Sequence, residues 1–150
     1  MASRVVPPRW PFRVDTIRYL VSGDRSLVES CDASVPQTVH VFASPTVPPP
    51  EDPEVDETLV VRGLEPRIPT QTVEVDLATP LVLEQDEFLY VAVTLARSGE
   101  DSPCRVGCLG GVPVRDDYIA FQGAPPFSWR VDRYEGEDAR SFVAALGELL

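Results

Sequence analysis

The sequence contains no lysine and no asparagine, so each of its 13 positive charges is an arginine. Without lysine, a Walker-type phosphate loop and Schiff-base chemistry are both excluded. The only histidine is His40, which excludes any metal site that needs two histidines. Long apolar runs are also missing, and no stretch reaches the roughly 20 residues of a membrane-spanning helix, so we expect no membrane insertion.

A secretory signal is not evident in the first residues. Residues 1–8 lack the apolar segment that such a signal requires. We therefore expect either a chain that is not exported by this route or a mature fragment behind an added methionine.

Acidic residues outnumber basic ones by 24 to 13, which gives a net charge of −11 over 150 residues. The arginines are scattered along the sequence, and an excess of negative charge repels phosphate backbones, so nucleic acid is not an expected partner. A hydrophobic fraction of 43% suits a folded chain. We expect a single domain over residues 1–150.

Short stretches of alternating or β-branched residues predict an all-β fold. The predicted strands are residues 11–21, 37–43, 58–62, 71–77, 80–83, 88–95, 118–121, 127–131 and 141–146. The last of these also has the alanine and leucine content of a helix. Eight or nine strands separated by proline and glycine turns indicate an antiparallel β-sandwich of jelly-roll type.

Three predicted strands carry the clearest patterns. Residues 71–77 alternate strictly, with Val73, Val75 and Leu77 on the inward face. Residues 11–21 alternate in the same way. Residues 88–95 are apolar on both faces, which is typical of a central strand covered on both sides.

Residues 44–57 hold five prolines and five carboxylates and cannot enter the middle of a sheet. They predict a long solvated loop, and residues 1–10 predict an N-terminal arm. The loop carboxylates are hard ligands for calcium, but they lack the spacing of an EF-hand loop. We therefore expect no cofactor and no metal.

Three cysteines, Cys31, Cys104 and Cys108, leave one thiol over if a single disulfide forms. We expect a bridge from Cys31 to one of the other two and hence an oxidising compartment. Reduced cysteines in a cytosolic protein are the alternative. Together with His40 they also form a Cys₃His set for zinc, but two of its four ligands lack a zinc-knuckle spacing.

His40 lies between two valines of an alternating strand, which predicts a solvent-facing position. No Gly-x-Ser-x-Gly motif supplies a nucleophile for it. We expect no catalytic residues and a protein that is not an enzyme. A small glycosidase-like hydrolase that uses two carboxylates is an alternative.

Aromatic residues near predicted turns and strand ends can stack on sugars or anchor a protein partner. The candidate binding residues are Trp129, Tyr118, Tyr134 and Trp10. Trp129, flanked by Ser128 and Arg130, is the preferred exposed candidate. Core or rim packing is the alternative for most of these rings.

Several segments together resemble bacterial extracellular β-sandwich modules of jelly-roll or galactose-binding-like type. The resemblance is carried by residues 11–19, 73–77, 80–83, 88–93 and 126–129, and by a closing strand near Phe142. It implies a surface appendage that binds glycans or proteins or acts as a spacer. No binding residues can be carried over from it.

These observations predict a non-enzymatic extracellular or cell-surface module for adhesion, binding or assembly, whose partner is a protein or a glycan. Self-association is compatible with this role. The alternative is a structural or decoration protein of a virion, because jelly rolls also build particle shells.

Overall fold

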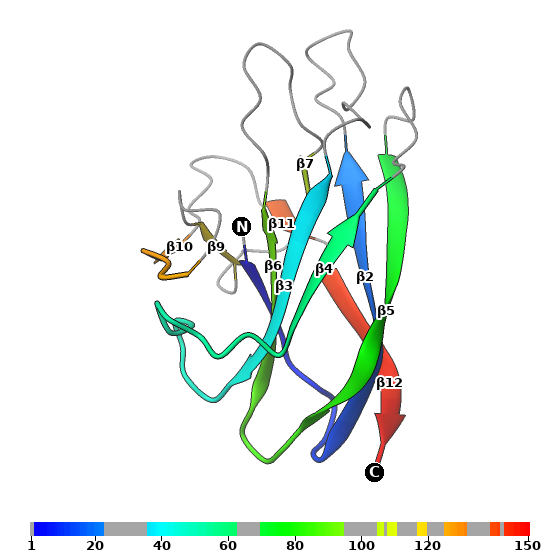
Figure 1. Ribbon diagram of the computed structural model, residues 1–150, viewed down its shortest axis with the longest axis vertical. Coiled ribbons are helices and arrows are strands. Elements are labelled where there is room, and N and C mark those ends of the chain that lie inside the picture. The colour runs from blue at the N-terminus through cyan, green and yellow to red at the C-terminus, as the bar shows by residue number, and fades with distance from the viewer. Residues whose placement is uncertain are drawn as a thin grey trace, which may run out of the picture.

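The computed structural model shows two antiparallel β-sheets packed face to face as a β-sandwich (Figure 1). Seven main strands divide into four in one sheet and three in the other. The residues that the structure describes are 2–22, 36–62, 70–94, 105–106, 108–110, 117–119, 125–131, 139–141 and 143–150. The predicted all-β sandwich is confirmed at this level.

The first sheet, called here the β6 sheet, contains both hairpin and long-range pairings. Its main strands, in spatial order, are β1 (Ala2–Val5), β6 (Phe88–Thr94), β3 (Gln37–Ser44) and β4 (Glu57–Val61). Two short strands, β9 (Asp117–Ile119) and β10 (Arg130–Val131), extend it beyond β1. Strand β1 falls within the predicted N-terminal arm and pairs with β6 along its whole length.

The second sheet, called here the β2 sheet, has β2 at its centre. Its strands, in spatial order, are β12 (Val143–Leu149), β2 (Phe12–Ser22) and β5 (Thr70–Leu83), and β7 (Arg105–Val106) also pairs with β2. Strands β8 (Cys108–Gly110) and β11 (Ala139–Ser141) form a separate pair. The two strands predicted over 71–77 and 80–83 form one continuous strand, β5. Its pairing with β2 is irregular where Val14 faces Leu81 and Thr16 faces Asp76, because β5 has more unpaired residues there than β2.

The core lies between the two sheets and follows the predicted alternation. On β2, Ile17, Tyr19 and Val21 are fully buried. They pack in one cluster with inward residues of β3, β5 and β6. Burial of these apolar side chains supplies the main driving force for stacking the sheets.

The β6 sheet is also covered on its outer face, as residues 88–95 predict for their strand. Tyr90 is fully buried and Ala92 is 3% exposed on the face of β6 that points away from the core. On the neighbouring strand β3, the outward residues Phe42 and His40 are 0% and 8% exposed. The predicted solvent-facing position of His40 is therefore wrong, because other parts of the chain cover this face.

Candidate functional site

An aromatic cluster covers the outer face of the β6 sheet. The rings of Phe42 and Tyr90 stack at 5.3 Å with an interplanar angle of 18°, and Trp129 packs against them. Phe127 lies 4.4 Å from Trp129, centroid to centroid, and is 3% exposed. These four residues, Phe42, Tyr90, Phe127 and Trp129, form what we call the aromatic cluster.

His40 borders this cluster. Its Nδ1 lies 3.1 Å from the hydroxyl of Thr58 on β4, and its ring lies 6.1 Å from that of Phe127. The covering segment, residues 125–129, is far away in the sequence. An alternating pattern predicts a strand with one exposed face, and it holds no information about a covering segment so distant. The sequence therefore predicted an exposed His40 where the structure has a buried one.

The cluster holds a proline-rich segment, residues 45–55, through main-chain carbonyl groups. The hydroxyl of Tyr90 donates to the carbonyl of Thr46 over 2.7 Å. The indole Nε1 of Trp129 donates to the carbonyl of Pro50 over 2.8 Å, and the amide of Phe127 donates to the carbonyl of Glu51. Three donors from two separate parts of the chain thus fix the path of this segment.

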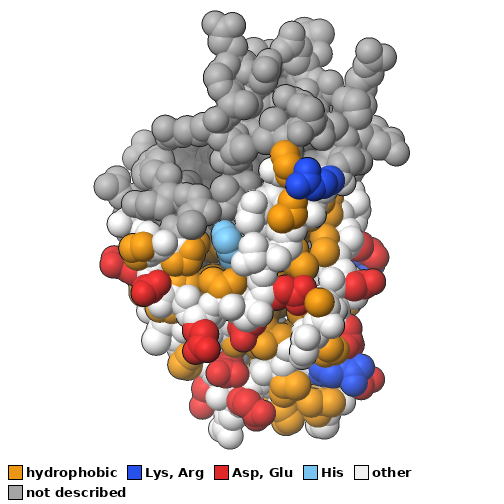
Figure 2. Space-filling model, viewed as in Figure 1, with side chains coloured by type: hydrophobic (Ala, Val, Ile, Leu, Met, Phe, Trp, Pro, Cys, Tyr) orange, Lys and Arg blue, Asp and Glu red, His pale blue; other side chains and the backbone are white. Residues whose placement is uncertain are grey.

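The proline-rich segment is less solvated than its sequence predicts. Pro49 and Pro53 are buried, whereas Glu51, Asp52 and Glu54 are exposed. Two prolines of the loop therefore pack inward, while Val47 stays 48% exposed and these three carboxylates face water. On the face drawn in Figure 2, acidic side chains gather over the lower half of the molecule.

The base of the loop is closed by Asp56. Its amide donates to the carbonyl of Val41 over 3.0 Å, and its Oδ2 accepts from the amide of Ala43 over 2.9 Å. Desolvation raises the pKa of the Asp56 carboxyl, and repulsion from Glu54 and Glu87 adds to this, while the hydrogen bond from Ala43 opposes it. Asp56 at the base of the loop is thus close enough to Glu87 of the β5–β6 turn for the two carboxylates to repel each other.

A small cavity opens next to Asp56, at the edge where β4 meets β5. It has a volume of about 120 Å³ and is lined by apolar side chains of β3 and β5 together with Asp56 and Glu57. Pockets for small molecules usually measure about 300–1,000 Å³. Glu57 also bridges the sheets here, because its two carboxylate oxygens accept from the amide of Ala78 at 2.9 and 3.0 Å. The cavity suits water better than a sugar.

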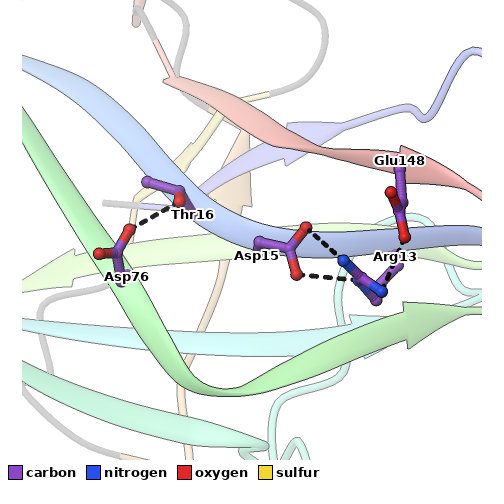
Figure 3. Close-up of polar contacts among 5 residues, drawn as sticks. All are labelled: Arg13, Asp15, Thr16, Asp76 and Glu148. Carbon is purple, nitrogen blue, oxygen red and sulfur yellow. Dashed lines mark hydrogen bonds and ion pairs between the residues drawn. The ribbon is translucent and has the colours of Figure 1, made fainter.

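The outer face of the β2 sheet is polar and internally paired (Figure 3). Arg13 lies between Asp15 and Glu148, with N–O distances of 2.9 and 2.7 Å, and Thr16 donates to Asp76 over 2.7 Å. Hydrogen bonding and attraction to Asp15 raise the pKa of Arg13. These exposed pairs satisfy one another, so this face resembles an ordinary solvated sheet surface.

The candidate binding residues have different positions. Trp129 and Trp10 are both half-buried, and the indole of Trp10 donates to the carbonyl of Glu87 over 2.8 Å. The structure places Tyr118 on β9 without describing its side chain, and Tyr134 lies outside the described residues. Of the two described tryptophans, Trp129 joins the aromatic cluster and Trp10 does not, and both use their N–H groups within the chain. A binding role for these residues stays a prediction.

The predicted disulfide falls on cysteines whose side chains lie outside the described part of the chain. Cys31 and Cys104 lie outside the described residues, and Cys108 lies on β8 with its side chain undescribed. Among the described residues, no three histidine, cysteine or carboxylate side chains gather in a way that would hold a metal ion. In the same part of the chain, no helix has the length and apolar character needed to cross a bilayer.

Sequence reasoning missed Phe42 and Tyr90 as members of the cluster. Phe42 and Tyr90 stand on strands whose other face is the core, so only the apolar character of both faces of residues 88–95 pointed to a covering layer. Phe88 belongs to the same surface, where the guanidinium of Arg4 lies 4.9 Å from its ring centroid.

Comparisons with known proteins return no relative. No family model matches the chain, and neither the curated proteins nor the solved structures include a match.

Proposed function

We propose that this chain is a non-enzymatic β-sandwich module, of jelly-roll type, in a secreted or surface-exposed bacterial protein. Its role is to bind a protein surface by means of the acidic side chains of the proline-rich segment. The observation that supports this proposal is the anchoring of that segment by Tyr90, Phe127 and Trp129.

Anchoring the backbone while exposing the side chains is an arrangement suited to recognition. A loop that is ordered before binding does not have to lose conformational entropy when its partner arrives. Binding residues are commonly carried on loops that a rigid scaffold positions. Here the exposed side chains include three carboxylates, Glu51, Asp52 and Glu54, so the complementary partner is a cationic protein surface.

The test is a binding screen with the full chain against arrays of basic peptides, proteins and glycans. The variant Glu51→Gln/Glu54→Gln removes two charges from the anchored segment. The matched control Glu74→Gln/Asp76→Asn removes two charges from the outer face of the β2 sheet. We expect the loop variant to lose about fivefold to tenfold in affinity for its best ligand and the control to change less than about twofold.

Other outcomes of this screen contradict the proposal. Equal losses in both variants would mean that net charge, not the anchored segment, governs binding. Ligands confined to neutral glycans would favour a lectin-like module, and cleavage of those glycans would favour the carboxylate-dependent hydrolase.

A further inference from the structure

The β2 sheet has two outer strands, and they differ in how well they are protected from pairing with another chain. Strand β5 is one of them, and the carboxylate of Glu57 accepts from the amide of Ala78 within it. Pro80 on the same strand has no amide to donate. Charged side chains and prolines are common devices that keep an edge strand from pairing further. Strand β5 is therefore poorly suited to accept another strand.

Strand β12 is the other outer strand and lacks these devices. Its sequence, VAALGEL, contains no proline and a single charged residue, Glu148, which pairs with Arg13 on β2 at 2.7 Å (Figure 3). Within the described part of the chain, β12 pairs with β2 and with no other strand. The backbone N–H and C=O groups on its other side can therefore pair with a further strand.

Strand β12 also leaves an apolar side chain of the core face uncovered. Leu149 lies opposite Phe12, and Phe12 lies opposite Leu83, so the three side chains share one face of the sheet. Phe12 and Leu83 are 8% and 1% exposed, whereas Leu149 is 51% exposed. A strand added at this edge would cover Leu149 if it placed an apolar residue opposite it.

A second copy of β12 supplies such a residue. Two identical strands that pair antiparallel about a two-fold axis, over the full length Val143–Leu149, place Leu149 opposite Val143 of the second copy. Leu146 then lies at the axis, opposite Leu146 of the second copy. Each copy therefore gives the exposed leucine of the other an apolar neighbour.

The same register suits the charged side chains. Within one copy, Glu148 lies opposite Arg13, and Ala144 lies opposite Arg18, which also pairs with Glu74. In the paired copies, Glu148 comes to lie opposite Ala144 of the second copy. Each Glu148 then stands between its own Arg13 and, across one small alanine, Arg18 of the other copy. The two Glu148 carboxylates do not face each other.

We propose that β12 is an interface through which two copies of this chain pair, edge to edge and antiparallel, into one continuous sheet with Leu146 at the two-fold axis. A second copy is the occupant because the strand complements itself in both its apolar and its charged side chains. The inference is independent of the ligand that the proline-rich segment binds. One strand pair is a small interface, so the dimer should be weak and depend on concentration.

The net charge of the chain opposes this association and sets the conditions of the test. Each copy carries a net charge of −11. At an ionic strength of about 0.15 M, exposed charges farther apart than roughly 8 Å are largely screened, whereas close pairs across the interface are screened less. The dimer is therefore measured at this ionic strength, with a reducing agent present so that no disulfide joins the copies.

The first experiment is sedimentation equilibrium of the full chain from micromolar to nearly millimolar concentration. We expect a reversible equilibrium between monomer and dimer. A chain that stays monomeric over the whole range contradicts the inference.

The second experiment tests which edge is used. Leu146→Lys sets two lysines against each other at the two-fold axis and should raise the dissociation constant of the dimer at least about tenfold. Val82→Lys is the matched control, because it replaces a 36% exposed valine on β5, at the opposite edge of the same sheet. We expect the control to change the constant less than about twofold. Equal effects of the two variants would overturn the inference.

The third experiment tests the register and covers the case in which Leu146→Lys does not fold. Ala144→Arg places an arginine opposite Glu148 of the second copy in both halves of the dimer, and Ala144→Glu places a glutamate there. We expect the dissociation constant of the arginine variant to be about tenfold lower than that of the glutamate variant. Equal constants, or the reverse order, would overturn the inference.

Thermal denaturation of the two Ala144 variants separates dimer formation from fold stability. Within one copy, Ala144 lies opposite Arg18, so the glutamate should stabilise the fold and the arginine should weaken it. This order is the reverse of the order expected for the dimer. A loss of folded protein therefore cannot imitate the predicted result.

Discussion

At the scale of single residues, Tyr19 shows how one buried hydrogen bond ties the two sheets together. Its hydroxyl, on β2, donates to Oε1 of Gln37 on β3 over 3.0 Å, and both residues are buried. Burial raises the pKa of Tyr19 well above its ordinary value of 10.0, because the phenolate cannot be solvated there. The stability that neutral Tyr19 contributes is therefore complete below pH 10 and is lost as the pH rises further.

Replacing Tyr19 by phenylalanine tests this account. We expect Tyr19→Phe to lower the free energy of unfolding at pH 7 by about 1–2 kcal/mol, because Gln37 loses this buried donor. Above pH 10, the native chain should lose stability more steeply than the variant, by up to about 1.4 kcal/mol per pH unit. Chemical denaturation between pH 7 and pH 11 measures both effects. Parallel pH profiles for the two proteins would contradict this role of Tyr19.

Asp56 gives a second prediction at the residue scale, in which the substitution stabilises the chain. Its carboxyl has a raised pKa, mainly from desolvation, so the stability it contributes is present at low pH and is lost as the pH rises through the carboxyl range. We expect Asp56→Asn to stabilise the chain at pH 7 by about 0.5 kcal/mol, because an amide oxygen still accepts from Ala43 without adding charge. The difference should vanish near pH 3. Urea denaturation at both pH values checks it, and a destabilised variant at pH 7 would refute it.

At the scale of elements, strand β12 depends on one glycine. Gly147 follows a shift in the pairing of β12 with β2, and a Cβ added there would collide with the main-chain carbonyl of Arg13. Backbone cannot move aside as easily as the end of a flexible side chain. The close approach of these two strands therefore requires glycine at this position.

We expect Gly147→Ala to destabilise the chain by about 2–3 kcal/mol, since relief of the collision must separate β12 from β2. Ala144→Ser, on the same strand, serves as the control and should change the stability by less than about 0.5 kcal/mol. Thermal denaturation of both variants measures the difference. Equal melting temperatures would show that β12 does not lie against β2 as described.

At the scale of elements, the sequence also predicts the strands that have a clear hydrophobic pattern and misses a strand too short to show one. Residues 88–95 were recognised as a central strand because both faces are apolar, and β6 lies between β1 and β3. Strand β1 escaped notice because its four residues, ASRV, are too few to show a period. The anchoring of the proline-rich segment was also beyond prediction, because every residue carries a carbonyl and no pattern marks which ones will accept.

At the scale of the whole molecule, alternation was sufficient to predict two facing sheets but not their strand order. Pairing partners such as β1 and β6 are distant in the sequence, and a period of two says only which face of a strand is buried. The contacts of the candidate site could not be predicted for the same reason. The sequence predicts Trp129 as an exposed aromatic, but Trp129 is half-buried and its indole donates to the carbonyl of Pro50, 79 residues away.

The proposed role requires the proline-rich segment to lie against the aromatic cluster in the folded chain. The most direct test is NMR of the native chain in solution, combining nuclear Overhauser contacts with exchange of the Trp129 indole proton. We predict contacts between the Trp129 ring and the proline-rich segment. We also predict that the indole proton of Trp129 exchanges much more slowly than in the unfolded chain. An indole proton that exchanges as in the unfolded chain, with no contacts to residues 45–53, would contradict the account.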